Sequence, residues 1–328
     1  MKTRTLSVLG LVALVAVTAA CASSHAAPGG DVLAGLDQTT TSTAPRSNGP
    51  PPNCNIGSFR PQGPLPPPGQ MPAGTFMRQI QDRGRLIVGV DQNTLLFGSR
   101  NPLTNQIEGF DIDMLHQVAN AIFGNPDRIE YRPITSAERI PAVRNRSVDI
   151  VAETMTINCE RWQQVDFTTD YYDAGQRVLV RSDSKAKSID DLGGKKVCAA
   201  AGSTSINNFA SRPSHPVPFI VADWTDCLVA LQEGTVDAIS TDDTILYGLK
   251  AQDPYTNIIG DPFSHEPYGM AIDQSHPDFV RFVNGVLEGV RASGNWGRIW
   301  THWIGAVLTP PPALPPPPPP PPAAVYRA

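Results

Sequence analysis

The chain has 328 residues, a formal net charge of −5 and a hydrophobic content of 41%. The length is enough for two domains of ordinary size, and the hydrophobic content is typical of a globular protein. Because acidic side chains outnumber basic ones and no basic run dominates, nucleic acid is excluded as an expected partner.

The first residues, "MKTRTLSVLGLVALVAVTAAC", are typical of a bacterial lipoprotein signal. Lys2 and Arg4 precede an apolar stretch, residues 6–17, that is too short for a comfortable membrane span. Small residues and Cys21 follow, so we expect residues 1–20 to be a signal peptide and Cys21 to carry a lipid. Thr18 departs from the motif, which usually has leucine there. The alternative is an ordinary secretory signal beside a free cysteine. Both predict an exported chain, and a lipid at Cys21 would hold it on the outer face of the cell membrane.

Proline is concentrated near both ends of the sequence. Ten prolines fall between Pro45 and Pro72, and eleven fall between Pro310 and Pro322. Such segments cannot form a core, so we expect residues 21–75 to be an extended tether and residues 309–328 to be a disordered polyproline tail. The tail is a spacer in one interpretation and a partner-binding motif in the other.

Between these ends, strand and helix patterns alternate twice. The first series comprises strands at 84–90, 129–134, 147–155 and 175–180, with helices at 109–123 and 135–143. The second comprises strands at 194–200, 217–223 and 235–243, with helices at 202–210 and 224–234. A strand at 268–273 and amphipathic helices over 276–305 complete the pattern. Two alternating series predict two α/β lobes.

Four cysteines remain if Cys21 is lipidated, and the oxidising exterior of a cell favours their pairing. Three pairings are possible. We prefer Cys198–Cys227 within one region and Cys54–Cys159, which would pin the tether onto the other.

Residues 154–167, "TMTINCERWQQVDF", place polar side chains at alternate positions. Thr154, Thr156 and Asn158 would share one face of an extended strand end, and Arg161 follows shortly. Hydroxyl groups beside a guanidinium form a good receptor for a small carboxylate. The alternative is that threonine is simply common in strands.

Five motifs occur in order along the chain: "GFDIDML", "TMTINCERWQQVDFTTDYYDAG", "AGSTS", "VDAISTDD" and "EPYGMAI". They resemble the signatures of polar amino-acid-binding proteins of ABC transporters, family 3 of the solute-binding proteins. The resemblance covers nearly all of residues 84–305. It is closest to actinobacterial, including mycobacterial, glutamate/aspartate/glutamine-binding lipoproteins, which share "VDQNTLLFG" and the cysteine positions.

The resemblance implies an α/β fold of the periplasmic-binding-protein type II, or Venus-flytrap, class. Lobe 1 would hold residues 76–181 and 268–308, and lobe 2 would hold residues 182–267. Two crossing strands would form the hinge, and the ligand would lie in the cleft between the lobes.

The resemblance also implies roles for residues that would grip the ligand backbone. Arg161 and the Thr156 hydroxyl would bind the α-carboxylate, together with the helix start at Ser203 and Thr204. The Thr154 carbonyl would accept from the α-ammonium, although many relatives have glycine there.

Asp242 would be the acid that binds the ammonium, and Asp243 is the neighbouring candidate. For the ligand side chain, Arg139 matches an arginine of dicarboxylate-specific relatives. Further candidates for the ligand site are Arg100, Phe97, Trp224 and Tyr268.

No hydrolase, metalloprotease or phosphate-loop motif is present, and the six histidines have no metal-ligand spacing. We therefore expect a monomeric binding protein, not an enzyme, without metal or cofactor. Its predicted ligands are aspartate and glutamate, with asparagine and glutamine as further candidates. Its partner would be an ABC permease, or alternatively a membrane-bound sensor that recognises the ligand-closed form. A dehydratase on the same fold is a third alternative.

Overall fold

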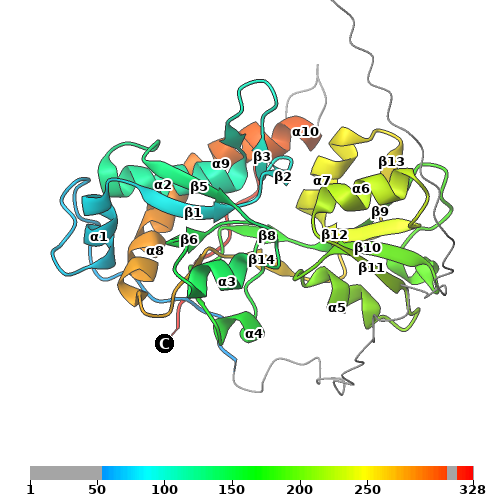
Figure 1. The fold of residues 1–328 in the computed structure, drawn as a ribbon, viewed down its shortest axis with the longest axis horizontal. Coiled ribbons are helices and arrows are strands. Elements are labelled where there is room, and N and C mark those ends of the chain that lie inside the picture. The colour runs from blue at the N-terminus through cyan, green and yellow to red at the C-terminus, as the bar shows by residue number, and fades with distance from the viewer. Residues whose placement is uncertain (1–53, 309–315, 328) are drawn as a thin grey trace, which may run out of the picture. The chain divides into compact units, whose positions relative to one another are not determined.

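The computed structural model describes residues 54–308 and 316–327, so the predicted signal peptide and Cys21 lie outside the described residues. Figure 1 labels many of the elements. The helices are α1 Phe76–Arg83, α2 Phe110–Phe123, α3 Arg139–Arg144, α4 Cys159–Trp162, η1 Ile189–Leu192, α5 Ser205–Ala210, α6 Trp224–Gln232, α7 Asp243–Gln252, α8 Pro277–Ala292, α9 Asn295–Trp300, η2 Thr301–Gly305 and α10 Ala306–Leu308. The strands are β1 Leu86–Val90, β2 Asn93–Thr94, β3 Gly98–Arg100, β4 Ile107–Glu108, β5 Ile129–Pro133, β6 Ile150–Val151, β7 Asp166–Phe167, β8 Tyr172–Ala174, β9 Gln176–Arg181, β10 Lys196–Ala200, β11 Val217–Val221, β12 Ala238–Asp242, β13 Thr256–Ile259, β14 Glu266–Tyr268 and β15 Ala271–Ile272.

Lobe 1 is built on a five-stranded sheet with the order β5-β1-β6-β15-β7. Strand β1 is parallel to β5 and β6, whereas β15 is antiparallel to β6 and β7. Helices α2, α8 and α9 contribute to the larger apolar core of this lobe, and α3 and α4 contribute to a second cluster that also contains Val151 and Ala271 of the sheet. The amphipathic helix predicted at 109–123 is α2, whose Ile112, Leu115, Ala119 and Ile122 are all buried.

Lobe 2 is built on a second five-stranded sheet with the order β11-β10-β12-β9-β13. Its apolar core is separate from that of lobe 1 and receives side chains from α5, α6 and α7. A disulfide joins Cys198 in β10 to Cys227 in α6, with a Cα–Cα distance of 5.6 Å. This is the pairing preferred from the sequence.

Two short strands connect the lobes. Strand β8 runs antiparallel to β14, so the chain crosses between the sheets at these two places. The lobe 2 sheet begins earlier than the predicted boundary at residue 182, because β9 pairs with both β12 and β13. Val178, Leu179 and Val180 of β9 are buried in the lobe 2 core, which accounts for this placement.

The proline-rich segments pack against lobe 1 where the structure describes them, unlike an extended tether and a disordered tail. Cys54 forms a disulfide with Cys159, the pairing preferred from the sequence, and Ser58 is completely buried in lobe 1. Tyr326 pairs with Ser58 as a parallel β-bridge, so residues 316–327 lie against the folded chain. The predicted tether and tail rested on proline content alone. The non-proline residues Ser58 and Tyr326 supply the contact that the prediction lacked.

Among the described residues, no helix is long and apolar enough to cross a membrane.

Candidate functional site

Buried polar side chains from both lobes meet around a small cavity of about 10 Å³. Its lining comes from Ser136, Arg139, Thr154, Thr156 and Arg161 in lobe 1 and from Ser203, Thr204, Ser205, Trp224, Thr241, Asp242 and Ile245 in lobe 2. Two larger hollows, of about 680 and 590 Å³, lie elsewhere. The small cavity is nevertheless the candidate site, because charges of opposite sign converge on it. We call it the inter-lobe site.

Thr154 sits at a sharp turn of the backbone at the edge of the inter-lobe site. Its φ of +44° lies in the left-handed region, which is unfavourable for a β-branched residue. Its N–H donates to Asp111 Oδ2 at 2.9 Å, and Tyr171 Oη donates to Asp111 Oδ1 at 2.7 Å. Burial raises the pKa of Asp111 to about 7. The predicted alternation along a strand is therefore wrong here, because β6 ends at Val151 and the chain then turns.

Arg161 lies in α4, a four-residue helix that is fixed at its start. Asn158 caps the helix, because its Oδ1 accepts from the Arg161 backbone N–H at 2.9 Å. The guanidinium donates to the Thr156 carbonyl at 2.7 Å and, across the lobes, to the Gly202 carbonyl at 3.1 Å. Burial and the nearby charge of Arg139 lower the pKa of Arg161 to about 9. The side chain is thus still a cation at neutral pH.

Arg139 is buried beside a carboxylate that the sequence analysis did not identify, Glu153. Its Nε lies 3.0 Å from Glu153 Oε2, while the Nε hydrogen points to the Ser136 carbonyl at 3.0 Å. Glu153 Oε2 consequently accepts no hydrogen bond from the residues that the structure describes. Burial raises the pKa of Glu153 to about 8, although Arg139 acts in the opposite direction. Glu153 therefore changes its protonation state close to neutral pH, and the net charge of the Arg139–Glu153 pair changes with it.

Gly202 of lobe 2 touches lobe 1 directly. Its carbonyl accepts from Arg139 Nη2 at 3.2 Å as well as from Arg161. Its φ is +76°, and an added Cβ would lie 2.6 Å from the Ala137 Cα. Only glycine allows this approach of the two backbones.

Ser203 and Thr204 follow Gly202 at the start of α5. Both line the inter-lobe site, but their hydroxyls are already engaged. Ser203 donates to the Ala200 carbonyl at 2.7 Å, and Thr204 donates to Glu266 Oε2 at 2.9 Å.

Asp242 ends β12 and is the buried acid of the inter-lobe site. Its Oδ2 accepts from Tyr268 Oη at 2.7 Å, whereas Oδ1 has no hydrogen-bond partner among the described residues. Burial, with the charge of Glu266, raises the pKa of Asp242 well above its usual range. Asp243 instead accepts from the backbone N–H groups of Thr244 and Gly175, so it has a structural role.

Trp224 of α6 also lines the inter-lobe site, and its indole Nε1 is buried with no hydrogen-bond partner among residues 54–308 and 316–327. A buried indole N–H normally finds an acceptor. Trp224 thus offers a free donor, and Asp242 offers a free acceptor.

Three other candidates lie outside the inter-lobe site. Arg100 is exposed and bonds to Gln92 and Asn105 in the β2–β4 hairpins. Phe97 is fully buried in the lobe 1 core against Phe110. Tyr268 is also fully buried, so it orients Asp242 and does not line the cavity. Nearness to the cleft along the chain does not reveal which way a side chain points, so the sequence could not place these three.

Glu266, at the hinge, is a second carboxylate that the sequence analysis did not single out. Its oxygens accept from Thr156 Oγ1 and Asn208 Nδ2, each at 2.7 Å, as well as from Thr204. It therefore connects lobe 1, the hinge and lobe 2. The signal available was its position in the motif "EPYGMAI".

The inter-lobe site combines two buried guanidinium groups with a buried carboxylate that has a free oxygen. Charges of both signs in one enclosed space suit a small zwitterion, because each charged end finds a desolvated partner. Across the described ranges, no group of three or more histidine, cysteine, aspartate or glutamate side chains could hold a metal ion. Two α/β lobes, a two-strand hinge and this site define a two-lobed solute-binding protein.

Comparison with known proteins gives the same class. The bacterial extracellular solute-binding proteins, family 3, match residues 86–306, and the chain belongs to this family. It is therefore an extracellular binding protein and not an enzyme, as the sequence predicted.

Individual relatives cover most of the folded chain. The ABC transporter glutamine-binding protein GlnH of Bacillus subtilis (strain 168) is 37% identical over 226 residues, which cover 69% of this chain and 83% of that protein. The glutamate-binding protein GluB of Corynebacterium glutamicum is 30% identical over 246 residues, covering 70% and 81%. A solved structure of an ancestral arginine-binding protein bound to glutamine superposes with a TM-score of 0.64 at 31% identity, covering 68% and 99%. The predicted fold class is confirmed.

Proposed function

We propose that this protein captures acidic amino acids, aspartate and glutamate, or their amides, for uptake by an ABC transporter. One observation carries the proposal. Asp242 holds a free, buried carboxylate oxygen in the same small space as the Arg161 guanidinium. A free α-amino acid carries the two opposite charges that these groups need.

The ligand α-carboxylate would bind to Arg161 and to the Thr156 hydroxyl. Charge-assisted hydrogen bonds of this kind contribute roughly 1.5–3 kcal/mol each. The backbone N–H groups around Ser203 and Thr204 would close on the same carboxylate from lobe 2. These contacts would replace the bonds that the Arg161 guanidinium and the Thr156 hydroxyl now make to Gly202 and Glu266.

The ligand ammonium would bind to Asp242 Oδ1 and to the Thr154 carbonyl. The left-handed turn at Thr154, fixed by Asp111, supports this assignment because it sets the direction of that carbonyl. The high pKa of Asp242 favours a cationic partner, since ionisation of a buried acid becomes favourable only beside a positive charge.

Arg139 and Trp224 are the groups available for the ligand side chain. Arg139 is compensated by Glu153, so an acidic side chain and an amide side chain are both compatible with this corner. The relatives support the same pair of ligand types, because one is a glutamine-binding protein and another a glutamate-binding protein.

Ligand access requires movement of the lobes. The inter-lobe cavity of about 10 Å³ has room for about one water molecule, far less than an amino acid. The lobes must separate at β8 and β14 and then close around the ligand. A micromolar dissociation constant, about −8 kcal/mol, would suit this capture.

A sensor that presents its ligand-closed form to a membrane signalling protein remains the alternative, because it would use the same site. We further propose a monomer that is anchored through lipidated Cys21. Uptake of labelled amino acids in a deletion strain separates the two roles. Lost uptake supports transport, whereas unchanged uptake with lost signalling supports the sensor.

Titration calorimetry against the twenty amino acids tests the binding proposal. We expect heat with aspartate, glutamate, asparagine or glutamine and little with the others. A folded protein that binds none of these four would overturn the proposal.

A further inference from the structure

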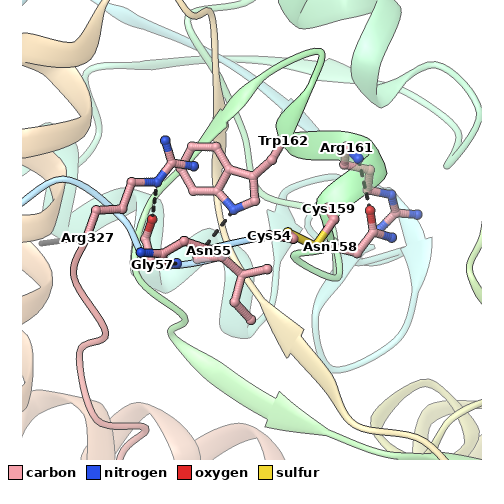
Figure 2. The surroundings of a disulfide bond; sticks show 9 residues. Cys54, Asn55, Gly57, Asn158, Cys159, Arg161, Trp162 and Arg327 are labelled. Atoms are coloured by element: carbon pink, nitrogen blue, oxygen red, sulfur yellow. Dashed lines mark hydrogen bonds between the residues drawn. A yellow bond between two sulfur atoms is a disulfide. The ribbon is translucent and has the colours of Figure 1, made fainter. Parts of the chain in front are cut away.

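Two segments that are far apart in the sequence contact α4, the helix that carries Arg161. These are residues 54–60 and residues 322–327, which we call the terminal clamp. Figure 2 shows the clamp around α4: Cys54 is bonded to Cys159, and Arg327 lies against Trp162. Cys159 and Trp162 lie on either side of Glu160 and Arg161 in the sequence.

The first half of the clamp makes two contacts with α4. The Cys54–Cys159 disulfide joins residues 105 positions apart at a Cα–Cα distance of 5.9 Å. Trp162 Nε1 donates to the Ile56 carbonyl at 3.2 Å. Both ends of this four-residue helix are thereby tied to residues 54–56.

The second half of the clamp, residues 322–327, forms backbone hydrogen bonds with the first half, residues 54–60. The Ser58 N–H donates to the Val325 carbonyl at 2.9 Å, and the Arg327 N–H donates to the Ser58 carbonyl at 2.8 Å. The two backbones are in close contact, because a Cβ added to Gly57 would lie 2.9 Å from the Arg327 nitrogen. Arg291 of α8 donates to the Pro322 carbonyl at 2.9 Å and holds the other end of this segment.

Arg327 joins the two halves to α4. Its guanidinium carbon lies 3.7 Å from the centre of the Trp162 ring, and its Nε donates to the Gly57 carbonyl at 2.6 Å. Trp162 is 7% exposed, so this cation–π contact covers a buried ring. The Arg327 side chain thus contacts both the 54–60 segment and Trp162, the residue next to Arg161.

We propose that Arg327 is a positioning residue for Arg161, acting through Trp162 and the terminal clamp. This inference rests on the proposed role of Arg161 in binding the ligand carboxylate. A four-residue helix has too few internal hydrogen bonds to hold its own orientation. The guanidinium of Arg161 must nevertheless meet a carboxylate within a few tenths of an ångström to form two parallel bonds. The clamp supplies the rigidity that α4 lacks.

Arg60 provides a matched control. Its guanidinium lies 4.7 Å from the centre of the Tyr326 ring, so it makes the same kind of contact within the clamp. Among the described residues, Arg60 stacks on Tyr326 and not on Trp162, whereas Arg327 stacks on Trp162. Loss of Arg60 weakens the clamp generally, whereas loss of Arg327 also frees α4.

The test uses the full chain in detergent, with L-glutamate as the probe and Arg327→Ala, Arg327→Lys and Arg60→Ala as variants. We expect Arg327→Ala to weaken L-glutamate binding about tenfold and Arg60→Ala less than twofold. Arg327→Lys should recover little, because lysine has no planar group to lie on the indole. In an Arg161→Lys background, Arg327→Ala should cost less than twofold, because the group that it positions is gone.

Hydrogen exchange without ligand makes the test independent of the proposed function. We expect the amides of residues 159–162 to exchange at least tenfold faster in Arg327→Ala than in wild type or Arg60→Ala. Unchanged exchange, or equal affinity losses for the two alanine variants, would overturn the positioning role. A wild type that does not bind L-glutamate would count against the proposed ligand class, while the exchange rates would still decide whether Arg327 holds α4.

Discussion

Thr156 of lobe 1 and Thr204 of lobe 2 donate hydrogen bonds to the same oxygen, Oε2 of Glu266, at 2.7 and 2.9 Å. Glu266 lies in β14, one of the two hinge strands. Its other oxygen accepts from Asn208 and Ser264. A single buried carboxylate thus gathers donors from both sides of the hinge.

Glu266→Ala should therefore lower the free energy of unfolding by about 3 kcal/mol, because one buried donor, Thr156, and three half-buried donors lose this acceptor. Glu266→Gln should cost less, since the amide oxygen can still accept and the hydroxyl groups can reverse. Urea unfolding of the ligand-free protein measures both. An alanine variant as stable as wild type would show that the network is not held by Glu266.

Asp242→Asn should weaken amino-acid binding by more than about a hundredfold, because the buried ammonium loses its counter-charge. The same change should stabilise the ligand-free protein at pH 7, because a neutral amide does not have the cost of burying a carboxylate. The pKa of Asp242 is raised on folding, so its ionisation costs stability as the pH rises above the unfolded value. The gain should consequently disappear below about pH 4. Asp243→Asn is the control and should leave affinity within about threefold. Equal effects of the two variants on affinity would contradict the assignment.

Thr154→Gly should stabilise the protein by about 1 kcal/mol and leave ligand affinity within a few fold. Relief of the strain at a φ of +44° is worth roughly 1–3 kcal/mol, and the greater freedom of unfolded glycine offsets part of it. Thr154→Ala keeps the Cβ and should show no such gain. Thermal denaturation of wild type and the two variants measures these differences. A glycine variant that is less stable than the alanine variant would show that the backbone at Thr154 is not strained.

The preference for L-glutamate over L-glutamine should fall as the pH rises from 7 to 9. The pKa of Glu153 is about 8, so its protonated form leaves Arg139 free for an acidic ligand side chain below that pH. Above it, the ionised carboxylate competes for Arg139 and repels the ligand. The measurement is the ratio of the dissociation constants of L-glutamate and L-glutamine. Protonation of groups that affect the binding of both ligands equally cancels in this ratio. In Glu153→Gln the ratio should not change with pH. A constant ratio in wild type would show that Glu153 does not face the ligand side chain.

Much of the architecture could be predicted from the sequence, because the spacing of apolar residues indicates which side of a helix or strand is buried. The amphipathic pattern at α2 and the apolar run at β1 predicted a helix and a strand, and the structure has both. The assignment of β9 to lobe 2 could not be read from the pattern, because strand pairing depends on partners far away in the chain.

The inter-lobe site was predicted in outline but not in its charge balance. Arg161, Arg139 and Asp242 line the site together as expected. Glu153, which pairs with Arg139, and Glu266, which accepts from Thr204, were missed. Glutamates are common on surfaces, so type alone gives no reason to place these two in the interior. Likewise, proline content predicted an extended tail but not its contact with α4, which depends on Arg327.

The most direct test of the central claim compares Arg161→Ala with wild type in calorimetric titrations against L-glutamate and L-glutamine. Arg144→Ala, a change on the exposed end of α3, is the matched control. We predict micromolar binding of at least one ligand by wild type and by the control, and a loss of at least about a hundredfold in Arg161→Ala. Equal binding by Arg161→Ala and wild type would contradict the account, because the ligand carboxylate would then not be held at this site.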